Sequence, residues 1–431
     1  MPEKNEDKSH RFISETIVGS PNSKERILRR LILTVFCAAL FGVVAAVCFA
    51  VSLPFVQKGL RRPPRENTQI TIPRDEAETS AAETTESGAQ AQTEGIDEVV
   101  RSEMEKYKYS YTIEDFNAMY DNLRTIADRA GDGVVAVHSI QHQTDWFDNP
   151  IETTGQFAGV IIVKTEEEVL ILTPDQAVET ADSIEVVFKS GTSLPGVVYQ
   201  KDAVSRLAVV GVDITSMSED QKNALKEISL GNSYAVKQGD AAIAVGGPAG
   251  MVRSTDYGFI SYVVKNVQTV DGMARVFYTS LRANASVGTF VLNTRGELIG
   301  WVTDAYDSGS MTAFASISDY KGILQNLTNG LPAPYLGVKG QEVSSELVAS
   351  GLPDGIYVTE CVGDSPAYNA GIQNGDIILQ VDGVRVEGTM KEFQNQIEAL
   401  VPGDKVKVVV ARGSREAYTE ITFEVTIGAR G

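Results

Sequence analysis

Short apolar runs bounded by Gly, Asn, Asp or Ser fill the middle of this chain of 431 residues. They recur from Gly133 to about Ile317. Runs of this length suit strands better than helices, and their regular alternation with turn residues is typical of an all-β barrel or sandwich. The sequence therefore predicts a mainly β fold for this part of the chain. The clearest runs are residues 134–137, 159–163, 169–173, 184–188, 207–210 and 241–245.

A smaller unit follows Pro332 and Pro334, which break the pattern. Three further apolar runs lie at 355–358, 376–381 and 405–410. Between the last two, three apolar residues recur at helical spacing, which places them on one face of a helix. The mixture of strands and a helix predicts an α+β domain over residues 333–429. The three helix residues are Phe393, Ile397 and Leu400.

The N-terminal part contains a long uncharged stretch, residues 31–57. A helix needs about 20 apolar residues to cross a bilayer, so this stretch is long enough. We expect a single transmembrane anchor over residues 31–55, preceded by a polar tail, 1–30. A cleaved signal peptide is the alternative, because small residues surround Cys48 and Ala50. Basic residues on both sides of the stretch nearly balance, so the charge rule alone does not decide the orientation.

Residues 56–112 are predicted to form a disordered acidic linker that ends at the start of a helix. Much of this segment is Glu, Thr, Ala, Ser and Gln, which bury too little apolar surface to offset the entropy of ordering. From Ile96 to Ala130 the pattern is helical, and Thr112 with Asp115 resembles a capping box. We expect its apolar stripe to pack against the next domain, with an oligomer contact as the alternative. The stripe consists of Phe116, Met119, Tyr120, Leu123, Ile126 and Ala127.

The composition excludes several classes of function. A net charge of −19 argues against a nucleic-acid partner, because binding to phosphates needs a basic surface. The three cysteines, Cys37, Cys48 and Cys361, do not suggest a disulfide framework. No Cys or His spacing of the zinc type is present, so we predict no metal site and no cofactor.

Several ordered pieces of the middle region resemble the protease domain of the HtrA/DegP family of trypsin-like serine proteases. The resemblance implies two six-stranded barrels of the chymotrypsin type within residues 113–330. Each piece is short, but together they keep the family's order over nearly half of the chain. The pieces are residues 159–162 with 169–173, then 207–210, then 230–233 with 238–240 and 244–250, and finally 292–293 with 296–300.

The last domain resembles a PDZ domain in the HtrA arrangement. The segments that carry this resemblance are 335–338, 351–353, 355–358, 364–367 and 370–378. Such a domain adds an extended peptide to a sheet edge and captures its terminal carboxylate with loop N–H groups. The resemblance places the carboxylate loop at Tyr335, Leu336, Gly337 and Val338. The pocket for the terminal side chain is expected at Ile356, Val358, Phe393 and Ile397.

The three catalytic positions of the protease family hold other residues in this chain. Gln176, Arg206 and Val287 stand where the family has His, Asp and Ser. Gln176 is no base near neutral pH, Arg206 would repel an imidazolium, and Val287 has no nucleophilic atom. Ala285 and Thr289 also replace glycines of the nucleophile loop, which puts the oxyanion hole in doubt. We therefore predict no catalytic residue and a degenerate triad.

No other constellation in the sequence replaces the triad. The chain's histidines are His10, in the tail, and His138 and His142, in and just after the first predicted strand. Ser286 or Thr289 beside a lysine would make a dyad, but no spacing favours one.

The sequence thus predicts a membrane-anchored HtrA-like pseudoprotease. The family resemblance implies that its N-terminus is cytoplasmic and that its large domains are extracytoplasmic. It would bind the C-terminal or extended segments of proteins through the PDZ domain, as a scaffold or quality-control adaptor at the cell envelope. The family resemblance also implies a homotrimer. The alternatives are an active serine endopeptidase with a non-standard constellation, and an envelope stress sensor.

Overall fold

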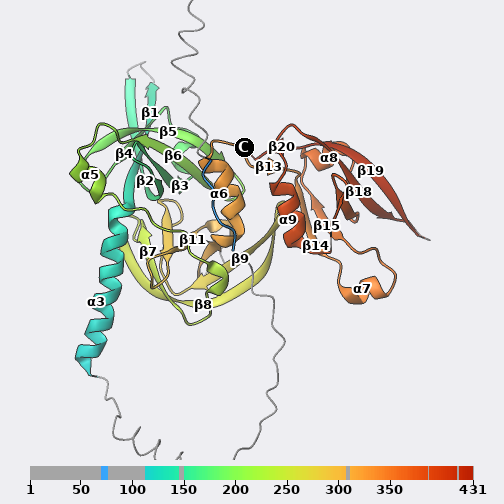
Figure 1. Cartoon of the computed structure of the whole chain (residues 1–431), viewed down its shortest axis with the longest axis horizontal. Coiled ribbons are helices and arrows are strands. Elements are labelled where there is room, and N and C mark those ends of the chain that lie inside the picture. Colours follow the sequence, from blue (N-terminus) through green and yellow to red (C-terminus); the bar gives the residue numbers. More distant parts are fainter. Residues whose placement is uncertain are drawn as a thin grey trace, which may run out of the picture. The chain divides into compact units, whose positions relative to one another are not determined.

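The computed structural model describes residues 69–75, 112–144, 150–306, 311–386, 388–414 and 417–430 (Figure 1). The predicted tail 1–30, the predicted anchor 31–55 and most of the predicted linker lie outside the described residues. Among the described helices, none is long and apolar enough to cross a membrane. The chain divides into the compact units Met1–Gln69 and Ile70–Gly431, and the barrels and the C-terminal domain belong to the second.

The first half of the β region is a closed six-stranded antiparallel barrel, in the order β1-β2-β3-β6-β5-β4. Strand β3 is buried along its whole length because its two faces pack against different cores. Ile171 belongs to the interior of this barrel, whereas Leu172 belongs to a cluster shared with Ile243 and Phe290 of the second barrel. The strands are β1 (Val134–Thr144), β2 (Pro150–Lys164), β3 (Glu168–Pro174), β4 (Ser183–Val187), β5 (Ser193–Asp202) and β6 (Leu207–Asp213).

A second closed barrel follows, in the order β10-β11-β12-β9-β8-β7. Phe277 and Phe314 stack inside it with ring centroids 4.8 Å apart. The predicted mainly β architecture with two six-stranded barrels is therefore confirmed. The strands are β7 (Ala241–Gly246), β8 (Ser254–Thr269), β9 (Gly272–Thr279), β10 (Thr289–Leu292), β11 (Leu298–Val302) and β12 (Thr312–Ser316).

The helices of this region are short apart from α3 (Ile113–Ala130), which begins at the capping box that Thr112 and Asp115 form. Its apolar stripe divides into two parts. Leu123 and Ile126 pack against the main core, whereas Phe116, Met119 and Tyr120 at the other end stay about half exposed. The expected packing therefore holds for only part of the stripe. The other helices are α4 (Gln176–Glu179), α5 (Glu219–Ala224), α6 (Lys321–Thr328) and the 3₁₀ turns Gly131–Gly133, Ser233–Ala235, Asp304–Tyr306 and Ser318–Tyr320.

The C-terminal domain is one antiparallel sheet in the order β14-β15-β16-β18-β19, with β17 paired to β16. Helix α9 packs its buried face on the apolar core of this sheet. The strands are β14 (Val338–Glu342), β15 (Ile356–Cys361), β16 (Ile377–Val381), β17 (Val384–Arg385), β18 (Lys405–Gly413) and β19 (Tyr418–Thr426), and β13 (Pro334–Tyr335) pairs with β20 (Gly428–Ala429). The helices are α7 (Ser345–Ala349), α8 (Pro366–Ala370) and α9 (Met390–Glu398).

Residues 70–75 depart from the predicted linker. Ile72 is almost fully buried in the main core, and its N–H donates to Gln325 Oε1 of α6 at 3.1 Å. Asp75 forms a 2.8 Å ion pair with the buried Lys321. Arg74 reaches α9, where it pairs with Glu398 at 2.9 Å. This stretch is therefore packed structure within a segment whose composition predicts a tether.

Candidate functional site

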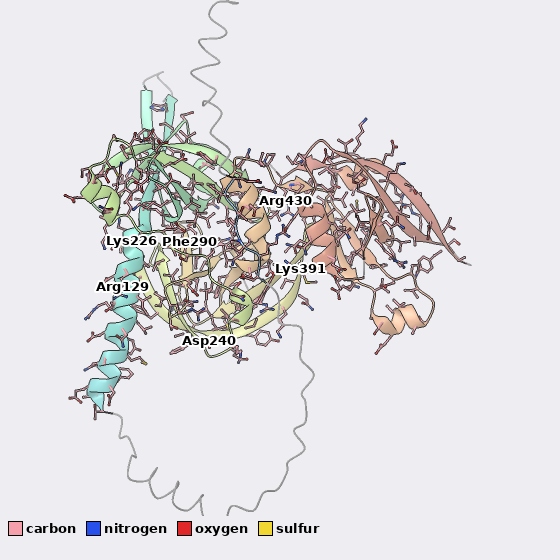
Figure 2. All side chains as sticks on the ribbon, viewed as in Figure 1. Arg129, Lys226, Asp240, Phe290, Lys391 and Arg430 are labelled. Carbon is pink, nitrogen blue, oxygen red and sulfur yellow. The ribbon has the colours of Figure 1, made fainter. Side chains whose placement is uncertain are left out.

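The degenerate catalytic positions lie around a hollow between the two barrels. Gln176 begins α4, directly after β3, and Arg206 occupies the turn before β6. Both line the hollow, together with Ala285 and Gly288 of the loop before β10 and Thr289 at the start of β10. Phe290, labelled in Figure 2, lines it as well. The fold thus brings two of the three predicted positions and the nucleophile loop to one place.

Arg206 makes an ion pair in the position where the family has a carboxylate. Its Nη1 lies 3.2 Å from Asp175 Oδ2, and its carbonyl accepts the Asp175 N–H at 3.0 Å. Asp175 is buried, and in the described structure its Oδ1 has no hydrogen-bond partner. Burial raises the pKa of Asp175, and Arg206 opposes that rise. The Arg206 guanidinium therefore pairs with the Asp175 carboxyl group, and no histidine is among the described residues that line the hollow.

Val287 packs where the nucleophile would stand. A Cβ built on Gly247 would lie 2.4 Å from Val287 Cγ1, so the valine side chain lies directly against that backbone. The Val287 carbonyl accepts the Ala158 N–H at 2.6 Å, and the Gly288 N–H donates to Ala285 at 3.2 Å. The loop that carries Val287 is therefore held by one hydrogen bond of its own and by one from β2.

The alternative nucleophiles are held within the same loop. Ser286 Oγ donates to Asn284 Oδ1 at 2.6 Å, and Thr289 Oγ1 donates to the Asn284 carbonyl at 2.9 Å. Neither His138 nor His142 lines the hollow, and the described residues place no lysine in its lining. Both histidines face carboxylates of the first barrel, Glu185 and Asp182. Within the described residues, neither hydroxyl has a histidine or a lysine as its hydrogen-bond partner.

The predicted carboxylate loop of the C-terminal domain has the geometry of an anion-binding turn. Gly337 has φ 90° and a Cβ there would lie 2.2 Å from Ser365 Cβ, so only glycine fits. The N–H groups of Leu336, Gly337 and Val338 all donate to one carboxylate. That carboxylate belongs to Asp271, in the turn between β8 and β9, and the sequence offered no signal for it.

The predicted pocket residues gather in one place but lie deep. Ile356, Val358, Phe393 and Ile397 share the core of the domain with Leu336 and Val338, and their side chains are fully buried. Tyr335 lies on β13 beside them. Because β15 lies inside the sheet, the edge that an added strand would use is β14, which the sequence pattern did not separate from the loop.

Comparison with known proteins gives a consistent assignment. Residues 157–300 match the trypsin-like peptidase domain family, and residues 334–423 match the PDZ domain family. The putative serine protease HhoA of Synechocystis is 30% identical over 279 residues, which cover 61% of this chain and 68% of that protein. This chain belongs to the HtrA/DegP-like family. The serine protease Do-like HtrA of Bacillus subtilis is 28% identical over 295 residues, 63% of this chain and 64% of that protein.

The solved structures agree with the HtrA-type fold. The HtrA-type protease AlgW with decapeptide superposes with a TM-score of 0.50 at 22% identity, over 72% of this chain and 99% of that one. At this identity the likeness concerns the fold alone. The relatives are described as serine proteases.

Proposed function

We propose that this HtrA-type chain is a pseudoprotease whose remaining activity is to bind protein segments. The observation that carries the proposal is the set of side chains in and beside the hollow between the barrels. Gln176 and Arg206 line it, Val287 packs beside it against Gly247, and none of the three performs a step of acyl transfer. Loss of a whole triad costs about 10⁶-fold in turnover number in a well-studied protease.

The test is casein cleavage by the full-length chain, measured beside its Gln176→His/Arg206→Asp/Val287→Ser variant. We expect no cleavage by the natural chain, and no labelling by a fluorophosphonate probe. The variant restores the three side chains but keeps Ala285 and Thr289, so we expect weak activity at most. Cleavage by the natural chain that persists through further purification, or labelling at Ser286, would establish an active enzyme instead.

The binding activity is proposed for the PDZ domain. AlgW is described as solved with a decapeptide, and this chain has the corresponding domain. Edge strand β14 and the N–H groups of residues 336–338 supply the two elements that capture of an extended C-terminal segment needs. The partners would be proteins with a free C-terminal carboxylate, held for a scaffolding or quality-control role.

The proposed location is the cell envelope, with residues 31–55 as a single-pass anchor and the N-terminus in the cytoplasm. The uncharged stretch 31–57 supports it. Extraction of membranes at alkaline pH tests the anchor: the full chain should stay in the membrane pellet, and a variant lacking residues 1–57 should be released. Equal release of both would refute the anchor.

A further inference from the structure

The carboxylate loop of the PDZ domain is occupied by a side chain of the second barrel. Leu336 N donates to Asp271 Oδ2 at 2.8 Å, and Val338 N donates to Oδ1 at 2.9 Å. Gly337 N lies between them, 2.8 Å from Oδ1 and 3.1 Å from Oδ2. Both oxygens of one carboxylate are thus bound by three consecutive backbone N–H groups, as a terminal carboxylate would be.

The backbone of Asp271 also forms a hydrogen bond with β14, as the last residue of a bound peptide strand would. Its N–H donates to the Val338 carbonyl at 2.7 Å, at the start of edge strand β14. Asp271 ends a tight turn in which Thr269 pairs with Gly272, and its φ is 61°. This left-handed conformation favours glycine or asparagine, and aspartate tolerates it. Asp271 therefore stands at a turn position where glycine would be less strained.

The rest of the turn lies between β14 and α9, which form the two sides of the proposed peptide site. On the side of β14, Gln268 Nε2 donates to Gln341 Oε1 at 3.2 Å. On the side of α9, a Cβ on Gly272 would lie 2.8 Å from Gln394 Oε1, so the backbone passes close to the helix. Met273 packs against the core of the PDZ domain. The turn therefore lies in the place of a bound peptide.

The electrostatic environment suits a held carboxylate. Asp271 is 1% exposed, and burial raises the pKa of its carboxyl group. The positive charge of Arg430 and the three loop N–H groups oppose that rise and favour the ionised form. Arg430, labelled in Figure 2, also donates to the Val270 carbonyl at 3.0 Å. The end of the PDZ domain thus fastens the turn from a second side.

We propose that Asp271 is an internal ligand of the PDZ domain, a latch that closes the carboxylate loop until a protein C-terminus displaces it. The inference rests on the proposed peptide-binding function of this loop. A tethered ligand acts at an effective concentration in the millimolar range, so weak competitors are excluded. The latch belongs to the second barrel, so capture of a C-terminus would remove this contact between the PDZ domain and that barrel.

Asp271→Gly in the full-length chain tests the latch. Glycine suits the left-handed turn, so the variant removes the carboxylate without straining the hairpin. Hydrogen exchange of the segment that contains residues 336–338 should become at least about tenfold faster, because unpaired loop amides open to water. Asp382→Gly is the matched control, because Asp382 is an exposed left-handed turn residue with φ 48° on the β16–β17 hairpin of the PDZ domain.

A second readout uses a pool of fluorescein-labelled decapeptides that end in Val, Leu or Phe with a free carboxylate, beside the same pool with amidated ends. The latch predicts that Asp271→Gly binds the free-carboxylate pool at least about tenfold more tightly than the natural chain does, with no gain for amidated peptides. Unchanged exchange at residues 336–338 in Asp271→Gly would overturn the latch. Faster exchange without any peptide binding would support the latch as a contact and refute the proposed peptide-binding function.

Discussion

At the scale of single residues, two of the three predicted degenerate positions make contacts within the fold. Val287 lies against Gly247, and Arg206 neutralises the buried Asp175. Restoring the triad therefore removes existing contacts as well as adding chemistry.

We expect Arg206→Gln to lower the free energy of unfolding by about 1–3 kcal/mol at pH 7, because it leaves the buried Asp175 carboxyl group without the partner of its ion pair. Burial already raises the pKa of Asp175, and loss of Arg206 should raise it further. A carboxyl group with a raised folded-state pKa lowers stability as pH rises through that pKa. The cost should therefore shrink as the pH falls toward 3.8, the ordinary value for Asp.

Urea titrations at several pH values measure this effect, with Arg206→Lys as the charge-preserving control. Equal destabilisation by Arg206→Gln at pH 7 and at pH 4 would mean that the ion pair with Asp175 is not the cause.

Gly337→Ala should destabilise the chain by about 3 kcal/mol or more, because a left-handed backbone and a steric clash add together. The added Cβ would lie 2.2 Å from Ser365 Cβ. Gly351→Ala is the control, because Gly351 has φ 105° and nothing lies within 4 Å of its would-be Cβ. Thermal unfolding should show the control losing only about 1–2 kcal/mol, the backbone cost alone. Similar losses in both variants would exclude the clash with Ser365.

At the scale of elements, the stretch 70–75 acts as a strap across α6 and α9. It connects helices of two domains through Ile72, Arg74 and Asp75. Its residues follow the predicted anchor, 31–55, in the sequence and fall within the segment predicted as a tether.

We expect Asp75→Ala to cost about 3–5 kcal/mol, because it leaves the buried Lys321 ammonium without its partner. Lys321 is 6% exposed at its side chain and lies 2.8 Å from Asp75, which also accepts from Ser318 Oγ at 2.5 Å. Asp132→Ala breaks a more exposed pair with Lys189 and should cost no more than about 1 kcal/mol. Urea unfolding compares the two variants, and equal costs would show that the strap adds no stability.

At the scale of the whole molecule, the latch and the strap both join the PDZ domain to the barrel region. Asp271 reaches the PDZ domain from the second barrel, and Arg74 reaches it from the strap. A ligand that displaces Asp271 and moves the PDZ domain must also break the contact between Arg74 and Glu398. Binding at the PDZ domain is therefore expected to depend on the state of the rest of the chain.

The homotrimer that the family implies has a candidate contact in the exposed end of α3. Ile113, Phe116, Met119 and Tyr120 are 65%, 51%, 49% and 46% exposed. We expect the natural chain in detergent to have three times the 46.5 kDa mass of one chain, and Phe116→Glu/Tyr120→Glu to shift it toward the single-chain mass. Light scattering measures this, with Asp121→Ala on the same helix as control. An unchanged mass in the double variant would exclude this end of α3 from the contact.

The sequence by itself predicted the strands and the domain order, because short apolar runs and turn residues are local properties. It also identified the capping box at Thr112. From the sequence we further predict a degenerate triad and the carboxylate loop at residues 335–338. Only the tertiary structure decided that β14 is the sheet edge, that residues 70–75 pack, and that Asp271 fills the loop. These facts depend on contacts between residues far apart in the chain, such as Asp271 and Gly337, which no local pattern encodes.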